Sequence, residues 1–98
     1  MASRHLARSL ALQSLFEGDI KGTLPTRAVI AAFERNAKES KADPDKIFAK
    51  TLIEGVLAKR EELDAVIVKA APQWPLESIS VIDRNILRLG LFELLFGD

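Results

Sequence analysis

The chain has 98 residues, with 14 basic and 14 acidic side chains, one histidine and no cysteine. This length supports one small domain with a modest core, so we expect a single domain over residues 1–98. The absence of cysteine excludes disulfides and thiolate metal sites and fits a reducing compartment. Because the charges balance, any affinity for nucleic acid has to come from a local basic patch.

The beginning of the chain lacks the continuous apolar stretch of a signal peptide. No segment offers about 18 or more uncharged apolar residues, the length that a membrane-spanning helix needs. We therefore expect a cytoplasmic protein that makes no contact with a membrane.

Two helices are predicted in the first 40 residues, and no segment of the chain reads as a convincing strand. The first helix covers residues 4–17, with Ser3 as its N-cap and Gly18 as its stop. The second helix begins after Pro25, with Thr26 as its cap. The residues of the second helix that are expected to face inward are Val29, Ile30, Phe33 and Ala37.

The third predicted helix is long and has the clearest start signal. Asp43 is expected at the N-cap and Pro44 at the first helical position, where the missing N–H of proline costs nothing. The helix should end near Ala71, because Pro72 disfavours helical backbone at the residue before it. The residues expected on its inward face are Ile47, Phe48, Leu52, Val56, Leu63 and Ile67.

The fourth predicted helix, residues 81–96, is apolar on nearly all sides. Ser80 and Asp83 form a weak version of a capping box at its start, and Trp74 is expected to fill the gap between the third and fourth helices. Helical spacing puts one set of apolar side chains on a common stripe, namely Ile82, Ile86, Leu89 and Phe96. A helix of this kind has to be buried on most sides, so it is either the centre of a bundle that lacks one wall or a surface for a partner.

The sequence offers little for catalysis. His5 is the single histidine, and nothing in the sequence orients a catalytic triad around it. Acidic pairs such as Glu61 and Glu62 are typical of solvated helix faces, and the five glycines form no phosphate-binding loop. We expect no enzymatic activity, no metal and no cofactor.

One local charge feature stands out at the start of the chain. Arg4, His5 and Arg8 precede the first acidic residue, and Arg4 and Arg8 are four residues apart, so they share one face of the first helix. Taken alone, this pair is more typical of a solvated face. The alternative is a phosphate-binding edge, because the planar fork of arginine suits phosphate oxygens.

Three segments of the chain resemble the NusB family of transcription antitermination factors. The segment RHLARSLALQSLFE (residues 4–17) is similar to the opening of the family. The segment FAKTLIEGVLAKREELDAVI (residues 48–67) resembles an apolar family helix with a glycine at mid-length. The segment WPLESISVIDRNILRLGLFELLF (residues 74–96) resembles the central helix of the family with its entry loop.

The resemblance implies an all-α helical bundle of the NusB type, with four helices present and the C-terminal helices of the family missing. It also implies a transcription antitermination factor that binds single-stranded boxA-type leader RNA of ribosomal RNA operons. Binding would take place together with the ribosomal protein NusE, and the RNA polymerase elongation complex would be an indirect partner.

The resemblance also suggests roles for particular residues. Arg4 and Arg8, with His5 between them, match the basic RNA-facing segment of the family. Phe16 and Asp83 match positions that lie toward the protein partner. Arg88 matches a recurrent arginine that could close a salt bridge or a helix contact, so it is not assigned to RNA.

The chain departs from the family at its C-terminal side, where the family continues with a proline-containing turn, a helix rich in alanine and glutamate, and a Lys-Phe-Val-Asn-Gly segment. Two other functions stay open. One is an accessory RNA-binding domain of a ribosomal RNA cytosine methyltransferase, and the other is a protein-interaction fragment without affinity for RNA.

The uncovered face of the fourth helix favours self-association. Large side chains that remain in water consume much of the small stability of a domain of this size. We therefore expect a homodimer. The residues expected at the centre of its interface are Leu91, Leu94, Leu95 and Phe96.

Overall fold

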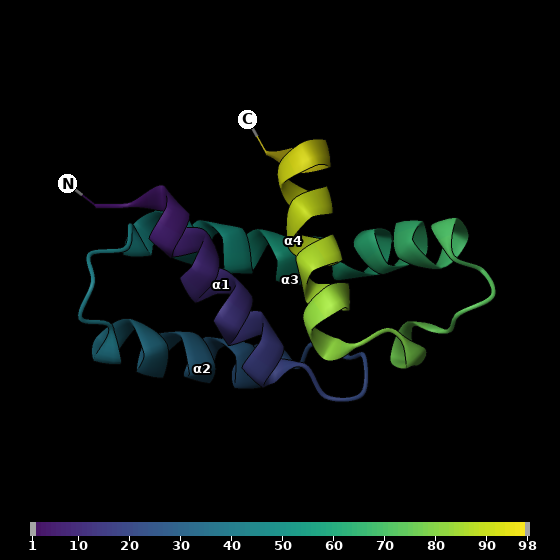
Figure 1. Cartoon of the computed structure of the whole chain (residues 1–98), viewed down its shortest axis with the longest axis horizontal. Coiled ribbons are helices and arrows are strands. Elements are labelled where there is room, and N and C mark those ends of the chain that lie inside the picture. Colours follow the sequence, from purple (N-terminus) through teal and green to yellow (C-terminus); the bar gives the residue numbers. More distant parts are fainter. Residues whose placement is uncertain (1, 98) are drawn as a thin grey trace.

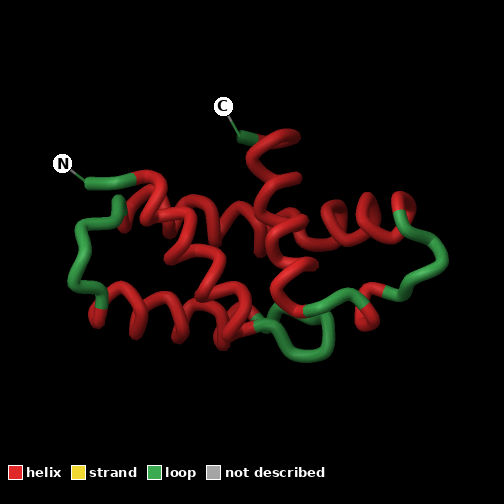
Figure 2. The backbone as a smooth tube through the Cα atoms, viewed as in Figure 1, coloured by secondary structure: helices red, strands yellow, loops and turns green. Residues whose placement is uncertain are grey.

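The computed structural model describes residues 2–97, and these residues form an all-α fold with no strand, as expected. Its elements are α1 (Arg4–Gly18), α2 (Thr26–Glu39), α3 (Lys46–Ala70), a short 3-10 helix η1 (Leu76–Ser78) and α4 (Val81–Phe96). Figure 2 shows these helices joined by loops alone. None of the helices in this part of the chain is both long enough and apolar enough to cross a membrane.

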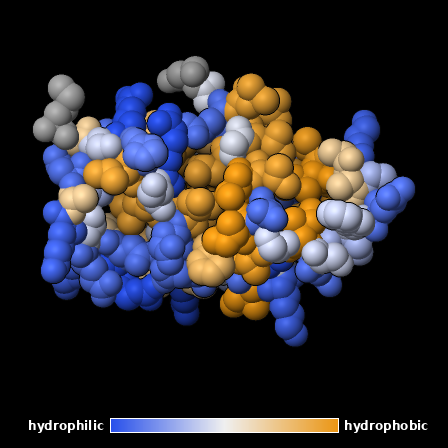
Figure 3. Space-filling model, in the orientation of Figure 1, coloured by the Kyte–Doolittle hydropathy of each residue, from blue (hydrophilic) through white to orange (hydrophobic). Residues whose placement is uncertain are grey.

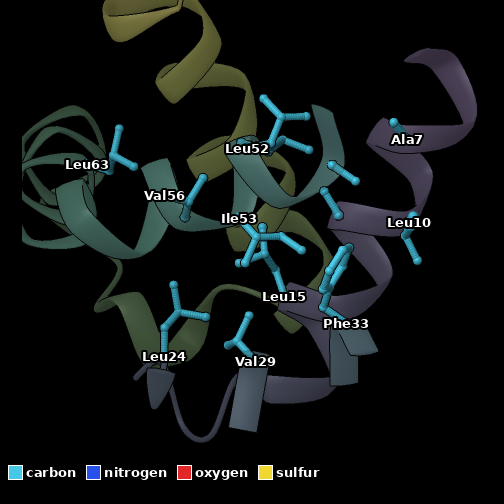
Figure 4. Close-up of a cluster of buried hydrophobic side chains, with 13 residues drawn as sticks. Ala7, Leu10, Leu15, Leu24, Val29, Phe33, Leu52, Ile53, Val56 and Leu63 are labelled. Atoms are coloured by element: carbon cyan, nitrogen blue, oxygen red, sulfur yellow. The ribbon is translucent and has the colours of Figure 1, made fainter. Parts of the chain in front are cut away.

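The long helix α3 forms the base on which the other helices lie (Figure 1). Helices α1 and α2 form a hairpin that packs on one half of α3, and α4 crosses α3 steeply beside α1. The core fills the space between α1, α2 and α3, and Leu15, Ile53 and Val56 are completely buried there (Figure 4). This arrangement brings the first turns of α1 close to α3 and to the last turns of α4.

Two of the predicted caps are confirmed. The hydroxyl of Ser3 accepts a hydrogen bond from the backbone N–H of Leu6 at 3.0 Å, and the hydroxyl of Ser80 accepts one from the N–H of Asp83 at 3.1 Å. The expected cap at Thr26 is wrong, because the N-cap of α2 is Pro25 and makes no side-chain hydrogen bond.

The predicted start of α3 is wrong by two residues. The N-cap is Asp45, whose carboxylate accepts from the N–H of Phe48 at 3.0 Å. The reason is a backbone bridge to the start of α1. The N–H of Ser3 donates to the carbonyl of Asp43, and the N–H of Asp45 donates to the carbonyl of Ser3, both at 2.8 Å. This pairing keeps residues 43–45 extended, so the helix begins later than expected.

The inward face of α4 also differs from the expected stripe. Leu89 is buried, but Ile82 and Ile86 are 42% and 47% exposed. The buried positions are taken by polar side chains, Arg84, Asn85 and Arg88, which find charged partners on other elements. Ion pairing therefore outweighs hydropathy in setting the rotation of this helix.

Two further apolar side chains lie outside the core, contrary to expectation. Ile47 is 82% exposed and lies in the first turn of α3. Trp74 is 65% exposed and lies in the loop that bows away from the bundle between α3 and α4 (Figure 1). It therefore does not fill the gap between these helices.

Candidate nucleic-acid interface

Arg4 and Arg8 lie over a single aromatic ring. The backbone bridge between Ser3 and residues 43–45 fixes the start of α1 beside the start of α3, which carries Phe48. The guanidinium carbons of Arg4 and Arg8 are 4.6 and 5.2 Å from the centre of the Phe48 ring. Both distances fall within the range of favourable cation–π contact. Phe48 was expected only as a core residue, yet it supports both predicted RNA-binding arginines.

Arg8 makes a second contact that joins α1 to α4. Its Nε donates to both carboxylate oxygens of Glu93, at 2.9 and 3.2 Å. The Arg8 side chain is 46% exposed and the Glu93 side chain 29%. The positive charge of Arg8 is therefore partly balanced by a carboxylate and still reaches solvent. His5, the third residue of the predicted basic set, is exposed beside them on α1.

A pocket lies where α1, α3 and α4 meet. Its lining combines the two arginines, the carboxylate and three aromatic rings, namely Arg4, Arg8, Glu93, Phe48, Phe92 and Phe96. The ring of Phe96 is also covered by the ammonium group of Lys59 at 4.9 Å. The two arginines therefore offer planar donor groups beside aromatic surface, an arrangement that suits a phosphate group. Within residues 2–97 no cluster of histidine, aspartate and glutamate side chains could hold a metal ion.

A second polar cluster is buried and centred on Arg88. Its Nε and one terminal nitrogen donate to the two oxygens of Asp64 at 2.7 and 3.0 Å, a bidentate pair. The other terminal nitrogen donates to Asp19 at 2.9 Å, and Arg88 also donates to the carbonyl of Gly22. The Arg88 side chain is completely buried. Arg88 therefore closes salt bridges, one of the two structural roles that the resemblance left open.

Asp19 holds this cluster together from the loop between α1 and α2. Its Oδ2 also accepts from Arg84 Nε at 2.7 Å and from Asn85 Nδ2 at 2.8 Å. Burial alone would raise the pKa of Asp19, but hydrogen bonds from Arg84 and Asn85 and the charge of Arg88 outweigh it, so the pKa lies below its ordinary value. Because the cluster is enclosed, its role is to fix α4 against α3 and the loop after α1.

The residues assigned to the protein partner lie at exposed positions. Phe16 is 36% exposed near the end of α1, and Asp83 is exposed in the first turn of α4. The ion pair between Asp19 and Arg84 ties together the two segments that carry them. The end of α1 and the start of α4 therefore form one continuous region of the molecule (Figure 1).

The residues assigned to the dimer interface differ in exposure. Leu94, Leu95 and Phe96 are 78%, 52% and 40% exposed, whereas Leu91 is half-buried and packs against the core. Figure 3 shows apolar side chains gathered over α4 and the nearby half of α3, while hydrophilic side chains dominate around the start of α1 and over α2.

Sequence reasoning missed four polar or aromatic residues that shape these sites, namely Asp19, Phe48, Asp64 and Glu93. A usable signal exists for Glu93, because a carboxylate inside an apolar run needs a charged partner if it is enclosed. The partner of Glu93 is 85 residues away in sequence, so the pattern of the helix alone does not identify it.

Comparison with a family model and with known proteins points to one family. The model of the NusB family matches residues 5–98. The chain is 39% identical over 95 residues to the transcription antitermination protein NusB of Myxococcus xanthus, covering 96% of this chain and 68% of that protein. It is 38% identical over 99 residues to the NusB protein of Streptomyces coelicolor, covering 100% of this chain and 69% of that protein. The chain thus spans about two thirds of the length of these two relatives. No solved structure matches this chain.

Proposed function

This chain belongs to the NusB family, and from that membership we propose that it is a transcription antitermination factor that binds boxA-type leader RNA of ribosomal RNA operons together with the ribosomal protein NusE. The names of its relatives support the antitermination role. In this proposal the factor works in the cytoplasm and reaches the RNA polymerase elongation complex indirectly. It acts by binding and not as an enzyme.

The observation that carries the RNA part of the proposal is the pair of arginines above Phe48. Single-stranded RNA is bound through its phosphates and through stacking on aromatic or guanidinium planes. Arg4 and Arg8 present two planar forks at an exposed corner, held by the same ring. His5 lies next to them and adds a further donor to this edge.

The RNA site is tested by replacing Arg4 and Arg8 together with alanine. Binding to boxA-like single-stranded RNA should weaken for all sequences, because these arginines would bind the RNA backbone and not the bases. The dependence of log affinity on log salt should also flatten by about 0.7 for each phosphate that is no longer neutralised. Fluorescence anisotropy titrations at several salt concentrations measure both quantities.

A matched control is the double variant Arg27→Ala and Lys38→Ala, which removes the same charge from positions on α2. This control should leave affinity and salt slope near those of the parent chain. Equal binding by the parent and by the variant lacking Arg4 and Arg8 would show that RNA is not bound at this edge.

The NusE surface is tested at Asp83. Replacing Asp83 with lysine reverses a charge in the first turn of α4, and we expect weaker capture of NusE in a pull-down, because interface rims are complementary in charge. The fold should persist, because Ser80 caps the helix through the backbone N–H of residue 83. Lysine near a helix N-terminus costs about 0.3–1 kcal/mol.

The milder variant Asp83→Asn separates charge reversal from loss of charge and should fall between the parent and the lysine variant. Circular dichroism verifies that helicity is retained. Undiminished capture of NusE by a folded lysine variant would remove Asp83 from the partner surface.

The alternative as an accessory domain of a ribosomal RNA cytosine methyltransferase has less support, because the relatives described above are named as antitermination proteins. A protein-interaction fragment without RNA affinity is distinguished from our proposal by the same titration. Such a fragment would show no salt-dependent binding to RNA.

A further inference from the structure

The guanidinium group of Arg8 is restrained on two sides. Glu93 accepts two hydrogen bonds from Nε, at 2.9 and 3.2 Å, so the carboxylate lies along one edge of the group. The ring of Phe48 covers one face, with 5.2 Å between the guanidinium carbon and the ring centre. Both neighbours come from other helices, since Glu93 lies on α4 and Phe48 on α3.

The contact with Glu93 leaves the opposite end of the fork for a ligand. Arginine binds phosphate best through two parallel N–H groups, and its two terminal nitrogens offer such a pair. Nε is the atom that Glu93 engages. The terminal nitrogens of Arg8 therefore remain suited to an oxyanion while the rest of the side chain is already in place.

From this geometry we propose that Glu93 is a positioning residue of the RNA site, which holds Arg8 so that its terminal nitrogens meet a backbone phosphate. The inference rests on the proposed function in RNA binding. It assigns to an acidic side chain a favourable role in binding a polyanion, which is the opposite of what its charge alone suggests.

Glu93 affects the affinity for RNA in two opposite ways, and the larger effect decides whether Glu93 strengthens or weakens binding. A carboxylate and a phosphate about 8 Å apart in water at physiological salt repel each other enough to weaken binding by a factor of about 1.4. Immobilising a long side chain on binding weakens affinity by a factor of about two to ten when it is not already ordered. Preorganisation therefore outweighs repulsion.

The decisive variant is Glu93→Ala, which removes the carboxylate and leaves a good helix former on α4. We expect binding to single-stranded boxA-like RNA to weaken by a factor of about two to ten, although the chain has become more basic. The control is Glu34→Ala, which makes the same change at an exposed position on α2 and should leave binding unchanged or slightly tighter. Equal or tighter binding by Glu93→Ala would overturn the proposal.

A double-mutant cycle shows whether Glu93 acts through Arg8. In a chain that already carries Arg8→Ala, the further change Glu93→Ala should have no weakening effect, because there is no guanidinium left to position. A purely structural role of Glu93 would weaken binding in both backgrounds, and this additive result would contradict the inference.

Arg8 can also be observed without RNA. The Nε–H signal of Arg8 in nitrogen-15 NMR should report an ordered side chain in the parent and a mobile one in Glu93→Ala. An unchanged order parameter would overturn the inference even where RNA binding itself is intact. If the parent binds no RNA, the proposed function fails and the inference falls with it. If the parent binds RNA through Arg4 and Arg8 but Glu93→Ala binds equally well, the inference alone fails.

Discussion

Asp19 carries a negative charge into the interior, and its Oδ2 accepts hydrogen bonds from Arg84, Asn85 and Arg88 at 2.7, 2.8 and 2.9 Å. Burial of an ionised carboxylate is costly unless it is paired and fully hydrogen-bonded. Here the cost is offset by two buried guanidinium groups, since Arg84 pairs with Asp19 and Arg88 pairs with both Asp19 and Asp64. Without Asp19, Arg84 would lose this ion pair and Arg88 would keep Asp64 as its partner.

The variant Asp19→Asn tests this dependence. It keeps the shape of the side chain but leaves Arg84 and Arg88 short of one negative charge, and we expect a loss of about 3–5 kcal/mol in the free energy of unfolding. Urea denaturation measures the change. The exposed variant Asp83→Asn is the control and should stay within about 0.5 kcal/mol of the parent. An equally small effect at Asp19 would mean that the cluster contributes nothing to stability.

The parent and Asp19→Asn also give a pH signature with a definite sign. Because the pKa of Asp19 is lower in the folded state, ionised Asp19 stabilises the fold at all pH values above its unfolded pKa of about 3.9. This stabilisation is lost as the pH falls from that value through the lower folded pKa. The free energy of unfolding of the parent should therefore fall more steeply in this acidic range than that of Asp19→Asn. If the two plots of free energy against pH are parallel, the pKa of Asp19 is not lowered in the folded state.

At the scale of helices, replacing two interior glycines with alanine is expected to change stability in opposite directions. A Cβ at Gly55 of α3 would clash with the tip of the Phe92 ring of α4, whereas a Cβ at Gly90 of α4 would meet nothing within 4 Å. Gly55→Ala should therefore destabilise the fold by about 1–3 kcal/mol through overpacking. Gly90→Ala should stabilise it by about 0.5–1 kcal/mol, because alanine favours the helix. Thermal denaturation of both variants measures the contrast, and a shift of the same sign in both would show that α3 and α4 do not cross as described.

The elements that could be predicted from sequence are those whose causes are local. The caps at Ser3 and Ser80 depend on hydrogen bonds that span three residues, and both were predicted. The common face of Arg4 and Arg8 follows from helical spacing alone. The start of α3 could not be predicted, because it depends on a backbone bridge between Ser3 and residues 43–45.

The candidate RNA site also combines residues that the sequence predicts with residues that only the fold brings together. Its two arginines carry a sequence signal, but Phe48 and Glu93 come from helices that meet α1 only in the folded chain. The rotation of α4 was mispredicted for the same reason. Hydropathy favours Ile82 and Ile86 as the inner stripe, and only the partners Asp19 and Asp64 make Arg84 and Arg88 the buried side chains instead.

The whole molecule is flat and elongated, with extents of 42 × 27 × 19 Å. The pocket that Arg4 and Arg8 line with the last turns of α4 adjoins the apolar surface that extends over the rest of α4 (Figure 3). An RNA bound at the corner formed by α1, α3 and α4 would therefore leave much of the outer face of α4 available to a protein.

We propose that the 98-residue chain forms a two-fold dimer through this face of α4. The exposed apolar side chains include Leu94 at 78% and Leu95 at 52%. Full burial of an exposed leucine stabilises a complex by about 1.5–3 kcal/mol. Asp83 is the exposed charge near one end of α4, so an antiparallel pairing of two α4 helices keeps the two copies of this carboxylate far apart. A second copy of the chain thus matches the apolar character of the face and keeps the two Asp83 carboxylates apart.

Sedimentation equilibrium over a range of concentrations tests the dimer. We expect the parent to approach twice its monomer mass, and we expect Leu94→Lys to remain monomeric, because a lysine at the centre of an apolar interface has no partner there. The variant Ile47→Lys is the control, since Ile47 is 82% exposed at the start of α3, outside the α4 face, and should dimerise as the parent does. A parent chain that stays a folded monomer at high concentration would refute the dimer and would mean that water contact at Leu94 and Leu95 is offset within the single chain by the packing of α4 on α1 and α3.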